Sequence, residues 1–285
     1  MHDKDYCTIP TEHFTIEGRS RAGNESWFRI RELGIALDIG RCPDVVVGLP
    51  NILITHAHLD HSLGVPFYAG QRHLQRLDGG RVFVPAEAAD DFRALLALHE
   101  KMENTSYGNI EIRGLAEGES VRLGRSLEVR AHRATHRVPA NAYELLEIRH
   151  HLKREYAGLG AERIAELRQQ GVEVAEEYRQ PILFYTGDTD RGILEQNEAI
   201  YAAEVLMMEC SFIADGHQGL AATYRHIHFD DIAEFAERFQ CALLVLTHFS
   251  RRYSRSEIQE GIRRRCPEVL KDRIRLALPE EYQRL

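Results

Sequence analysis

The stretch Asn51-Ile-Leu-Ile-Thr-His-Ala-His-Leu-Asp-His61 carries the strongest structural signal in this chain. Its apolar, β-branched first half predicts a buried strand. Its second half places four side chains that can bind metal at the carboxyl end of that strand. Alternate residues of an extended chain point the same way, so His56 and His58 can share one ion. Asp60 and His61 would face a second ion after the chain turns, and we therefore predict half of a two-metal site.

Polar residues also follow the ends of other predicted strands. The alternative for residues 56–61 alone is a polar turn rich in histidine, but four such residues at one strand end rarely coincide by chance. The residues that follow predicted strand ends are His56, His58, Asp60, His61, His136, Asp188, Glu209 and His248. A layered sheet brings such ends to one rim. There Asp188 could bridge two ions that activate a water for attack on a phosphodiester.

Each of the more distant residues also has a structural interpretation. A structural loop, a turn and a capped core position are the alternatives for His136, Asp188 and His248, respectively. Glu209 could lie beside the metals without binding them. His226 and His228 precede a predicted helix, where one of them could cap the helix or shuttle a proton to the leaving group.

The composition narrows the class of protein. The chain has 285 residues, a formal net charge of −8 and five scattered cysteines. Its acidic balance argues against non-specific coating of nucleic acid, although a local basic patch with metal ions remains compatible with it. The odd number of cysteines, without a Cys-x-x-Cys pair, predicts reduced thiols in a cytoplasmic compartment. No apolar run approaches the roughly 20 residues that span a bilayer, so no membrane partner is expected.

The order of the predicted elements favours one α/β domain over residues 1–285, because strand-rich segments precede mixed strands and helices without a repeat or linker. Residues 149–180 are dense in charge and predict a helical insertion on the surface, with a helix over 161–170. The insertion could be a solvated arm. Alternatively, it could bring a basic edge near the site, formed by Arg149, His150, His151, Lys153 and Arg154.

Local signals predict several other elements. Helices are expected over residues 68–77 and 86–102, the second of them opened by a proline. Asp230 is a candidate N-cap of a later helix. Ser254 and Glu257 have the spacing of a capping box, which predicts one further helix.

Taken together, these motifs resemble the metallo-β-lactamase superfamily and, within it, the ribonuclease Z family. The first motif, residues 55–61, is specific only for the superfamily. The narrower resemblance rests on His136-Arg-Val-Pro139, Thr186-Gly-Asp-Thr189, Glu209-Cys-Ser-Phe212 and Thr247-His-Phe-Ser-Arg-Arg-Tyr253. The turn at residues 40–43 and the charged segment 152–174 are most similar to the short plant-type enzymes.

The resemblance implies an αββα sandwich of two mixed sheets flanked by helices. It implies these ligand sets: His56, His58 and His136 for one zinc ion, Asp60, His61 and His248 for the other, and Asp188 between them. By the same match, the catalytic residues would be Asp60 with the proton-shuttling pair Glu209 and His226, and the residues contacting substrate phosphate would be Ser250 and Arg252.

The implied reaction is endonucleolytic removal of the 3′ trailer from precursor tRNA by a cytoplasmic homodimer. It would leave a 3′-hydroxyl on the tRNA and a 5′-phosphate on the trailer. Zinc is the expected metal, although Mn²⁺ and Fe²⁺ also accept His and carboxylate ligands.

The chain also departs from the family pattern. Met208 stands where the family has a histidine before the glutamate, and residues 18–24 replace a Pro-, Lys- and Arg-rich loop that guides the acceptor end. A long Gly-Pro-rich arm is not recognisable. One alternative is therefore a hydrolase of the same fold that cleaves a small ester, thioester or cyclic phosphodiester. Another is a non-catalytic nucleic-acid-binding relative, against which the intact ligand set argues.

Overall fold

Two seven-stranded sheets face each other in the computed structural model, which describes residues 6–108 and 110–279. The first sheet contains, in spatial order, β1 (Cys7–Pro10), β2 (Thr15–Arg21), β3 (Glu25–Ile30), β4 (Ile35–Leu37), β5 (Asn51–Leu53), β6 (Gly80–Pro85) and β7 (Ile110–Leu115). The second sheet contains, in the reverse of its spatial order, β8 (Ser120–Arg122), β9 (Leu127–Ala134), β10 (Ala140–Leu152), β11 (Ala175–Tyr185), β12 (Val205–Glu209), β13 (Leu243–Thr247) and β14 (Ile274–Leu276).

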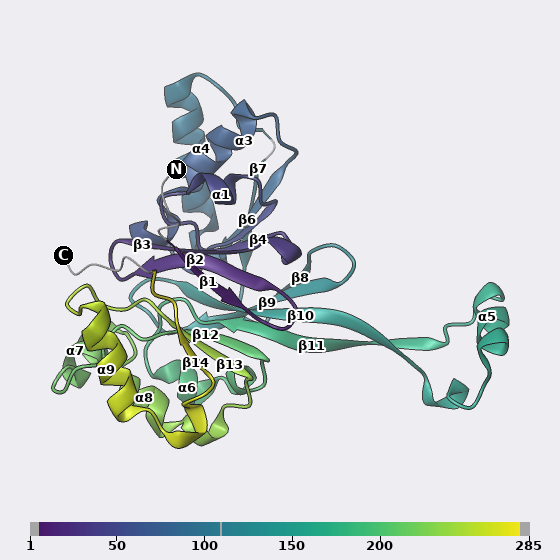
Figure 1. Ribbon diagram of the computed structural model, residues 1–285. Coiled ribbons are helices and arrows are strands. Elements are labelled where there is room, and N and C mark those ends of the chain that lie inside the picture. Colours follow the sequence, from purple (N-terminus) through teal and green to yellow (C-terminus); the bar gives the residue numbers. More distant parts are fainter. Residues whose placement is uncertain (1–5, 109, 280–285) are drawn as a thin grey trace.

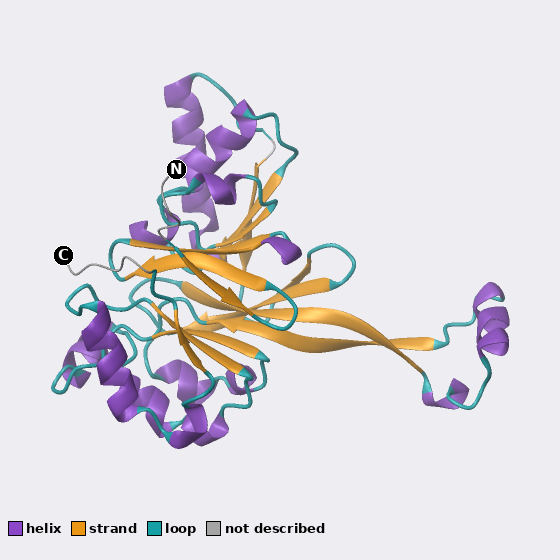
Figure 2. Cartoon of the chain, in the orientation of Figure 1, coloured by secondary structure: helices purple, strands orange, loops and turns teal. Residues whose placement is uncertain are grey.

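Each sheet is antiparallel in one half and parallel in the other. Strands β1 to β4 and β8 to β11 pair antiparallel, whereas β4 to β7 and β11 to β14 pair parallel. Parallel neighbours need crossover connections, which here carry helices to the outer faces (Figure 2). These helices are α1 (Asp44–Val47), α2 (Leu59–Ser62), α3 (Val65–Leu74) and α4 (Ala89–Glu103) on the first sheet, and α6 (Gly192–Gln196), α7 (Gln218–Tyr224), α8 (Phe229–Glu234) and α9 (Arg255–Arg265) on the second. The predicted αββα sandwich is confirmed.

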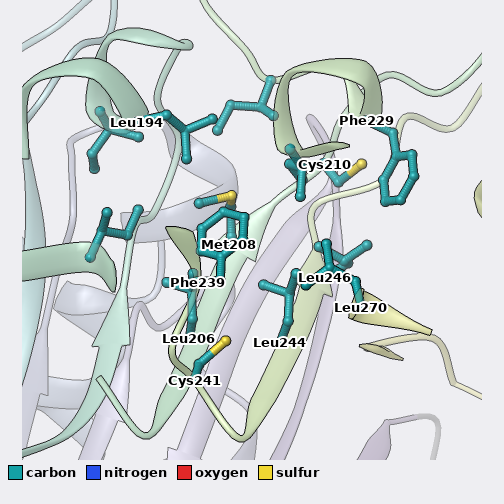
Figure 3. Close-up of a cluster of buried hydrophobic side chains, with 14 of the residues drawn as sticks. Leu194, Leu206, Met208, Cys210, Phe229, Phe239, Cys241, Leu244, Leu246 and Leu270 are labelled. Atoms are coloured by element: carbon teal, nitrogen blue, oxygen red, sulfur yellow. The ribbon is translucent and has the colours of Figure 1, made fainter. Parts of the chain in front are cut away.

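Three apolar clusters hold these layers together. One lies between the sheets and includes Phe28, Phe83 and Leu183, and the other two lie between each sheet and its helices. Strand β12 divides its side chains between two of them, because successive residues of a strand face opposite sides. Met207 therefore packs between the sheets, and Met208 packs under the helices among the side chains in Figure 3. Met208 thus belongs to the hydrophobic core, away from the metal-binding rim.

Residues 149–180 form a long arm, in agreement with the predicted surface insertion and its helix over 161–170, but most of the other residues of this segment are not helical. The outer halves of β10 and β11 remain paired as far as Leu152 and Ala175 and project from the body (Figure 1). Only α5 (Ala161–Gln169), with a short 3-10 turn at Arg154–Tyr156, is helical at the tip. The sequence of these two strands does not alternate between apolar and polar residues, because a projecting hairpin has no core against which apolar residues could pack.

Of the two alternatives for this segment, the solvated arm agrees with the structure, and the basic edge near the site is wrong. Strand β11 ends near the site at Tyr185, and its other end lies about 30 Å further along the arm at the usual rise of a strand. The basic side chains of the arm instead find acidic partners within it, in the pairs Arg149–Glu147, His150–Glu177, His151–Glu176 and Lys153–Glu173.

Most local predictions agree with the structure within a few residues. The two early helices are α3 and α4, the second preceded by a 3-10 turn at Ala86–Ala88. Ser254 and Glu257 form the predicted capping box of α9. Asp230 is not the N-cap of α8. His228 takes that role, because its ring nitrogen accepts the Asp230 N–H at 3.1 Å as a carboxylate would. Among the described residues, no helix is long and apolar enough to cross a bilayer.

Candidate metal centre

The candidate metal ligands come from four chain segments that converge on one rim of the two sheets. Strand β5 ends at Leu53, and the chain then runs extended to His58 before α2 begins. His136 follows β9, Asp188 follows β11 and His248 follows β13. The segment after β5 is fastened to the second sheet, because Asn141 N–H donates to the Thr55 carbonyl at 2.9 Å and the Tyr143 hydroxyl donates to the Ile54 carbonyl at 2.7 Å.

Four of these residues form a first cluster, which comprises His56, His58, His136 and Asp188. One ligand atom from each lies within 4.8 Å of all the others. His58 Nδ1 is 3.0 Å from His56 Nε2 and 3.2 Å from His136 Nε2. The residues predicted from strand alternation to share an ion, His56 and His58, are therefore neighbours around one point.

Asp60, His61 and His248 form a second cluster beside the first. The Nε2 atoms of His61 and His248 are 3.4 Å apart, and Asp60 Oδ2 lies 3.7 Å and 3.6 Å from them. Asp188 lies between the clusters, because its carboxylate oxygens are 3.3 Å from His61, 3.4 Å from His248 and 3.7 Å from His56. This is the position expected of a bridging carboxylate.

The donor geometry fits two metal ions. Two nitrogens that bind one zinc tetrahedrally at 2.0–2.1 Å lie about 3.4 Å apart, close to the nitrogen separations in both clusters. Asp188 Oδ1 is completely buried without a hydrogen-bond donor, which is costly unless a cation contacts it. Burial lowers the pKa of His56 well below its usual value and also lowers that of His136, so both rings are neutral and able to bind metal.

Neighbouring imidazoles keep the two carboxylates of the centre, Asp188 and Asp60, in their ionised form. Burial alone raises the pKa of Asp188, but His248 and His61 outweigh it and hold that pKa well below the usual range. Asp60 behaves in the same way: burial raises its pKa, and the adjacent His248 and His61 bring it down overall. Both carboxylates are therefore available as ligands at neutral pH.

Asp38 supports the second cluster, and sequence reasoning gave it no role. Its buried carboxylate lies 2.7 Å from His61 Nδ1 and accepts hydrogen bonds from the Tyr185 hydroxyl and from Thr55. Burial lowers the pKa of His61, but Asp188 and Asp38 raise it well above the usual value. The 2.7 Å contact with Asp38 holds a proton on His61 Nδ1, so Nε2 is the nitrogen that faces the cluster. In the structure Asp38 directly follows β4, so it too comes after the end of a strand.

Gly187 allows Asp188 to approach the rim. Its φ of +57° lies in the left-handed region, and a Cβ atom at this position would lie 2.6 Å from the Thr55 side chain. Any other residue would therefore push the turn after β11 away from the segment that carries His56. The glycine is required by this contact between the two sheets as well as by the backbone angle.

Glu209 and His226, the predicted proton-transfer pair, lie beside the two clusters. His226 Nδ1 is 2.8 Å from Glu209 Oε1, and Glu209 is completely buried. Burial lowers the pKa of His226, but the Glu209 carboxylate outweighs this effect and raises it to about 9. His226 is therefore protonated at neutral pH. The structure thus separates the two predicted alternatives, because His226 pairs with Glu209 while His228 caps α8.

Ser211 connects this pair to the second cluster, a contact not foreseen from the sequence. Its hydroxyl donates to Glu209 Oε2 at 2.7 Å and lies 2.9 Å from His248 Nδ1. Because the single hydroxyl proton is given to Glu209, Ser211 accepts the Nδ1 proton of His248. Nε2 of His248 then remains free to bind metal, so the chain His248–Ser211–Glu209–His226 sets the tautomer of a candidate metal ligand.

An open groove of about 1480 Å³ runs from the clusters to α9. The predicted phosphate-binding residues both line it, and Arg252 Nη1 lies 3.4 Å from the Ser250 hydroxyl. The turn between β2 and β3 reaches the same place, where Gly23 N–H donates to Asp60 Oδ2 at 2.8 Å. The segment that replaces the family's guiding loop is therefore part of the rim.

The fold and the clustered ligands define a protein of the β-lactamase superfamily, and a family model described as "Beta-lactamase superfamily domain" matches residues 40–249. The chain is 33% identical over 254 residues to tRNase Z TRZ1 of Arabidopsis thaliana, covering 88% of this chain and 90% of that protein. It is also 33% identical over 257 residues to the chloroplastic tRNase Z TRZ2 of the same plant, with 89% and 72% coverage. The chain belongs to the tRNase Z family.

Solved structures agree with this fold. The short form of human tRNase Z matches with a TM-score of 0.57 at 17% identity, covering 95% of this chain and 92% of that one. The family and the His- and Asp-rich clusters together identify a tRNase Z-like metallohydrolase with a centre suited to two ions.

Proposed function

We propose that this protein is an endonuclease that removes the 3′ trailer from precursor tRNA, with two zinc ions as its resident metals. The observation that carries the proposal is the meeting of both ligand clusters with the Glu209–His226 pair at one end of an open groove. Relatives that carry the name tRNase Z support the choice of substrate. Nitrogen-rich ligand sets favour zinc over Mn²⁺.

Bound at these clusters, two ions would supply an activated water and neutralise charge on the phosphate. The first cluster would use His56, His58 and His136, the second Asp60, His61 and His248, and Asp188 would be shared. His226 holds a proton that Glu209 stabilises, and it lies where it can protonate a leaving oxygen. Ser250 and Arg252, which line the groove, would orient the phosphate.

We also propose that two chains associate through the face formed by α2, α3 and α4. This face exposes a row of large apolar side chains, namely Leu59, Leu63, Phe67, Leu95, Leu98 and Met102. Several of them line one apolar hollow of about 350 Å³. Contiguous exposed apolar surface of this kind is typical of an interaction site. Light scattering should give the mass of a dimer, and Phe67→Arg should give a monomer; a monomeric wild-type protein would refute this association.

The decisive experiment is cleavage of a labelled precursor tRNA by the zinc-loaded protein, with Asp60→Ala as the control. Bis(p-nitrophenyl) phosphate is hydrolysed in parallel by both proteins. A single cut after the last nucleotide before the trailer, lost in Asp60→Ala, supports the proposal. Hydrolysis of the small diester with the tRNA left intact overturns it.

A hydrolase of small phosphodiesters or esters is the second candidate. The formal net charge of −8 favours it, and so does the charge of the arm, since residues 149–180 contain six Arg or Lys and six Glu. An arm without net positive charge offers little electrostatic attraction to a polyanion. The tRNA-intact outcome of the same experiment would select this candidate.

A further inference from the structure

Beside the proton-transfer pair lies an aromatic surface that the proposed reaction does not use. It comprises Phe212, Tyr224 and Arg137, all of which line the groove. The two rings are within 13° of parallel, with centroids 6.5 Å apart. The Arg137 guanidinium lies over the Tyr224 ring, 5.1 Å from its centroid. We call these three residues the stacking platform.

The platform is fixed to the reacting groups through the backbone. Tyr224 ends α7, two residues before His226, and Arg137 directly follows His136. The His136 ring contacts the carbonyl of Arg225 at 3.1 Å, which ties the end of α7 to the first cluster. The Phe212 ring lies 6.3 Å from the ring of His226. A planar group on the platform would therefore lie next to the proton donor.

Two of the three residues of the platform are exposed to solvent. Phe212 is buried and forms the base, whereas Tyr224 is 38% exposed and Arg137 is also exposed. The Tyr224 hydroxyl makes no hydrogen bond within the described part of the chain. The fold therefore leaves the ring and the guanidinium open to the groove, and both are surfaces on which nucleobases stack.

The chemistry of the proposed cut indicates which base would lie there. A cut that leaves a 3′-hydroxyl on the tRNA expels the 3′ oxygen of the nucleotide on the 5′ side. The proton donor must reach that oxygen, so His226 lies beside the ribose of this nucleotide. The base on the same ribose is then the nearest planar group to Tyr224.

We propose that Tyr224 and Arg137 stack the base of the nucleotide on the 5′ side of the cut, with Phe212 supporting Tyr224. This inference rests on the proposed function and narrows its substrate class to RNA in which that nucleotide is unpaired, because a base inside a helix has both faces covered by the neighbouring base pairs. Stacking is tolerant of base identity, so the platform selects for an unpaired base in general.

The test compares two precursor RNAs, one intact and one abasic at this single nucleotide, under single-turnover conditions. The wild-type protein should cleave the abasic RNA about 10-fold more slowly, the loss expected for one stacked base. Tyr224→Ala should cleave the intact RNA about 10-fold more slowly and show almost no further loss on the abasic RNA. Tyr224→Phe should restore the wild-type behaviour, because it keeps the ring.

Tyr178→Ala is the matched control, because Tyr178 is 37% exposed but lies in the arm. It should keep the full abasic penalty. Zinc content and circular dichroism of Tyr224→Ala verify that the protein is folded. If the abasic change slowed cleavage by Tyr224→Ala as much as it slows cleavage by the wild-type protein, the platform would be overturned. Cleavage of the abasic RNA by the wild-type protein as fast as the intact RNA would also overturn it. Failure of the wild-type protein to cut either RNA would overturn the proposed function together with the platform.

Discussion

The rim and the arm are equally rich in His and carboxylate side chains, yet the structure uses them in opposite ways. In the rim, His56, Asp188 and His248 are buried, and the Asp188 carboxylate lies against the two imidazoles. In the arm, none of residues 149–173, all of which the structure describes, is buried, and pairs such as His151–Glu176 at 2.7 Å are exposed. Exposed ion pairs contribute about 0–1 kcal/mol. A cluster of charged residues therefore indicates a functional site when the residues are buried, and not when they are exposed to water.

Replacement of Asp188 tests the rim side of this contrast most severely. Asp188→Ala removes the one carboxylate that both clusters share, so the variant should lose metal and its hydrolysis of bis(p-nitrophenyl) phosphate should fall to background. Metal analysis and initial rates measure both effects. Glu176→Ala, which removes a carboxylate from the arm, should retain full metal content. Two ions per chain in Asp188→Ala would show that Asp188 is not a ligand.

Replacement of His226 separates proton transfer from metal binding. His226→Ala should slow cleavage of precursor tRNA by about 10²–10⁴-fold, the usual contribution of a general acid. Hydrolysis of bis(p-nitrophenyl) phosphate should change far less, because p-nitrophenolate leaves without a proton. An equal loss on both substrates would exclude the general-acid role.

The pH dependence gives a second test of His226. Its pKa is raised to about 9, so the protonated form needed by the reaction is present below that pKa and is lost as pH rises through it. Bound cations can only lower the pKa of a nearby imidazolium, so the descending limb of the rate profile should lie at or below pH 9. The limb should disappear in His226→Ala, and its persistence would assign it to another group.

Ser211 should have a smaller effect. Ser211→Ala removes the acceptor for His248 Nδ1, and loss of such a partner typically weakens metal binding by about 10–100-fold. Competition with a zinc chelator measures this affinity directly. Ser211→Thr keeps the hydroxyl and should restore most of it. An unchanged zinc affinity in Ser211→Ala would mean that His248 holds its tautomer without help.

The arm should give the smallest effect. Glu166→Ala breaks the exposed pair with Arg163 at 2.7 Å, which should change the free energy of unfolding by less than about 0.5 kcal/mol. Chemical denaturation measures the change. A loss of several kcal/mol would show that this ion pair is buried in solution, as the charged groups of the rim are.

The sequence was sufficient for the layered fold and for the meeting of His56, His136, Asp188 and His248, because apolar strands ending in polar residues leave a clear pattern. The helix at the tip of the arm was predicted, but the two strands that carry it were not, since a projecting hairpin has no core and therefore no alternation. Asp38 directly follows β4 in the structure, but it stands between Leu37 and Ile39 in the sequence, so no predicted strand end marked it. The contact between Ser211 and His248 joins residues 37 positions apart and has no sequence pattern of its own.

The candidate ligands come from both sheets, so metal binding should also affect the thermal stability of the protein. All five cysteines are free, so no disulfide ties the two halves together. An ion held by His56 and Asp188 would be a reversible cross-link between the sheets, closing a long loop of polypeptide. The melting temperature should then rise with free zinc concentration by mass action. Removal of zinc would therefore lower the thermal stability of the fold, even when no substrate is present.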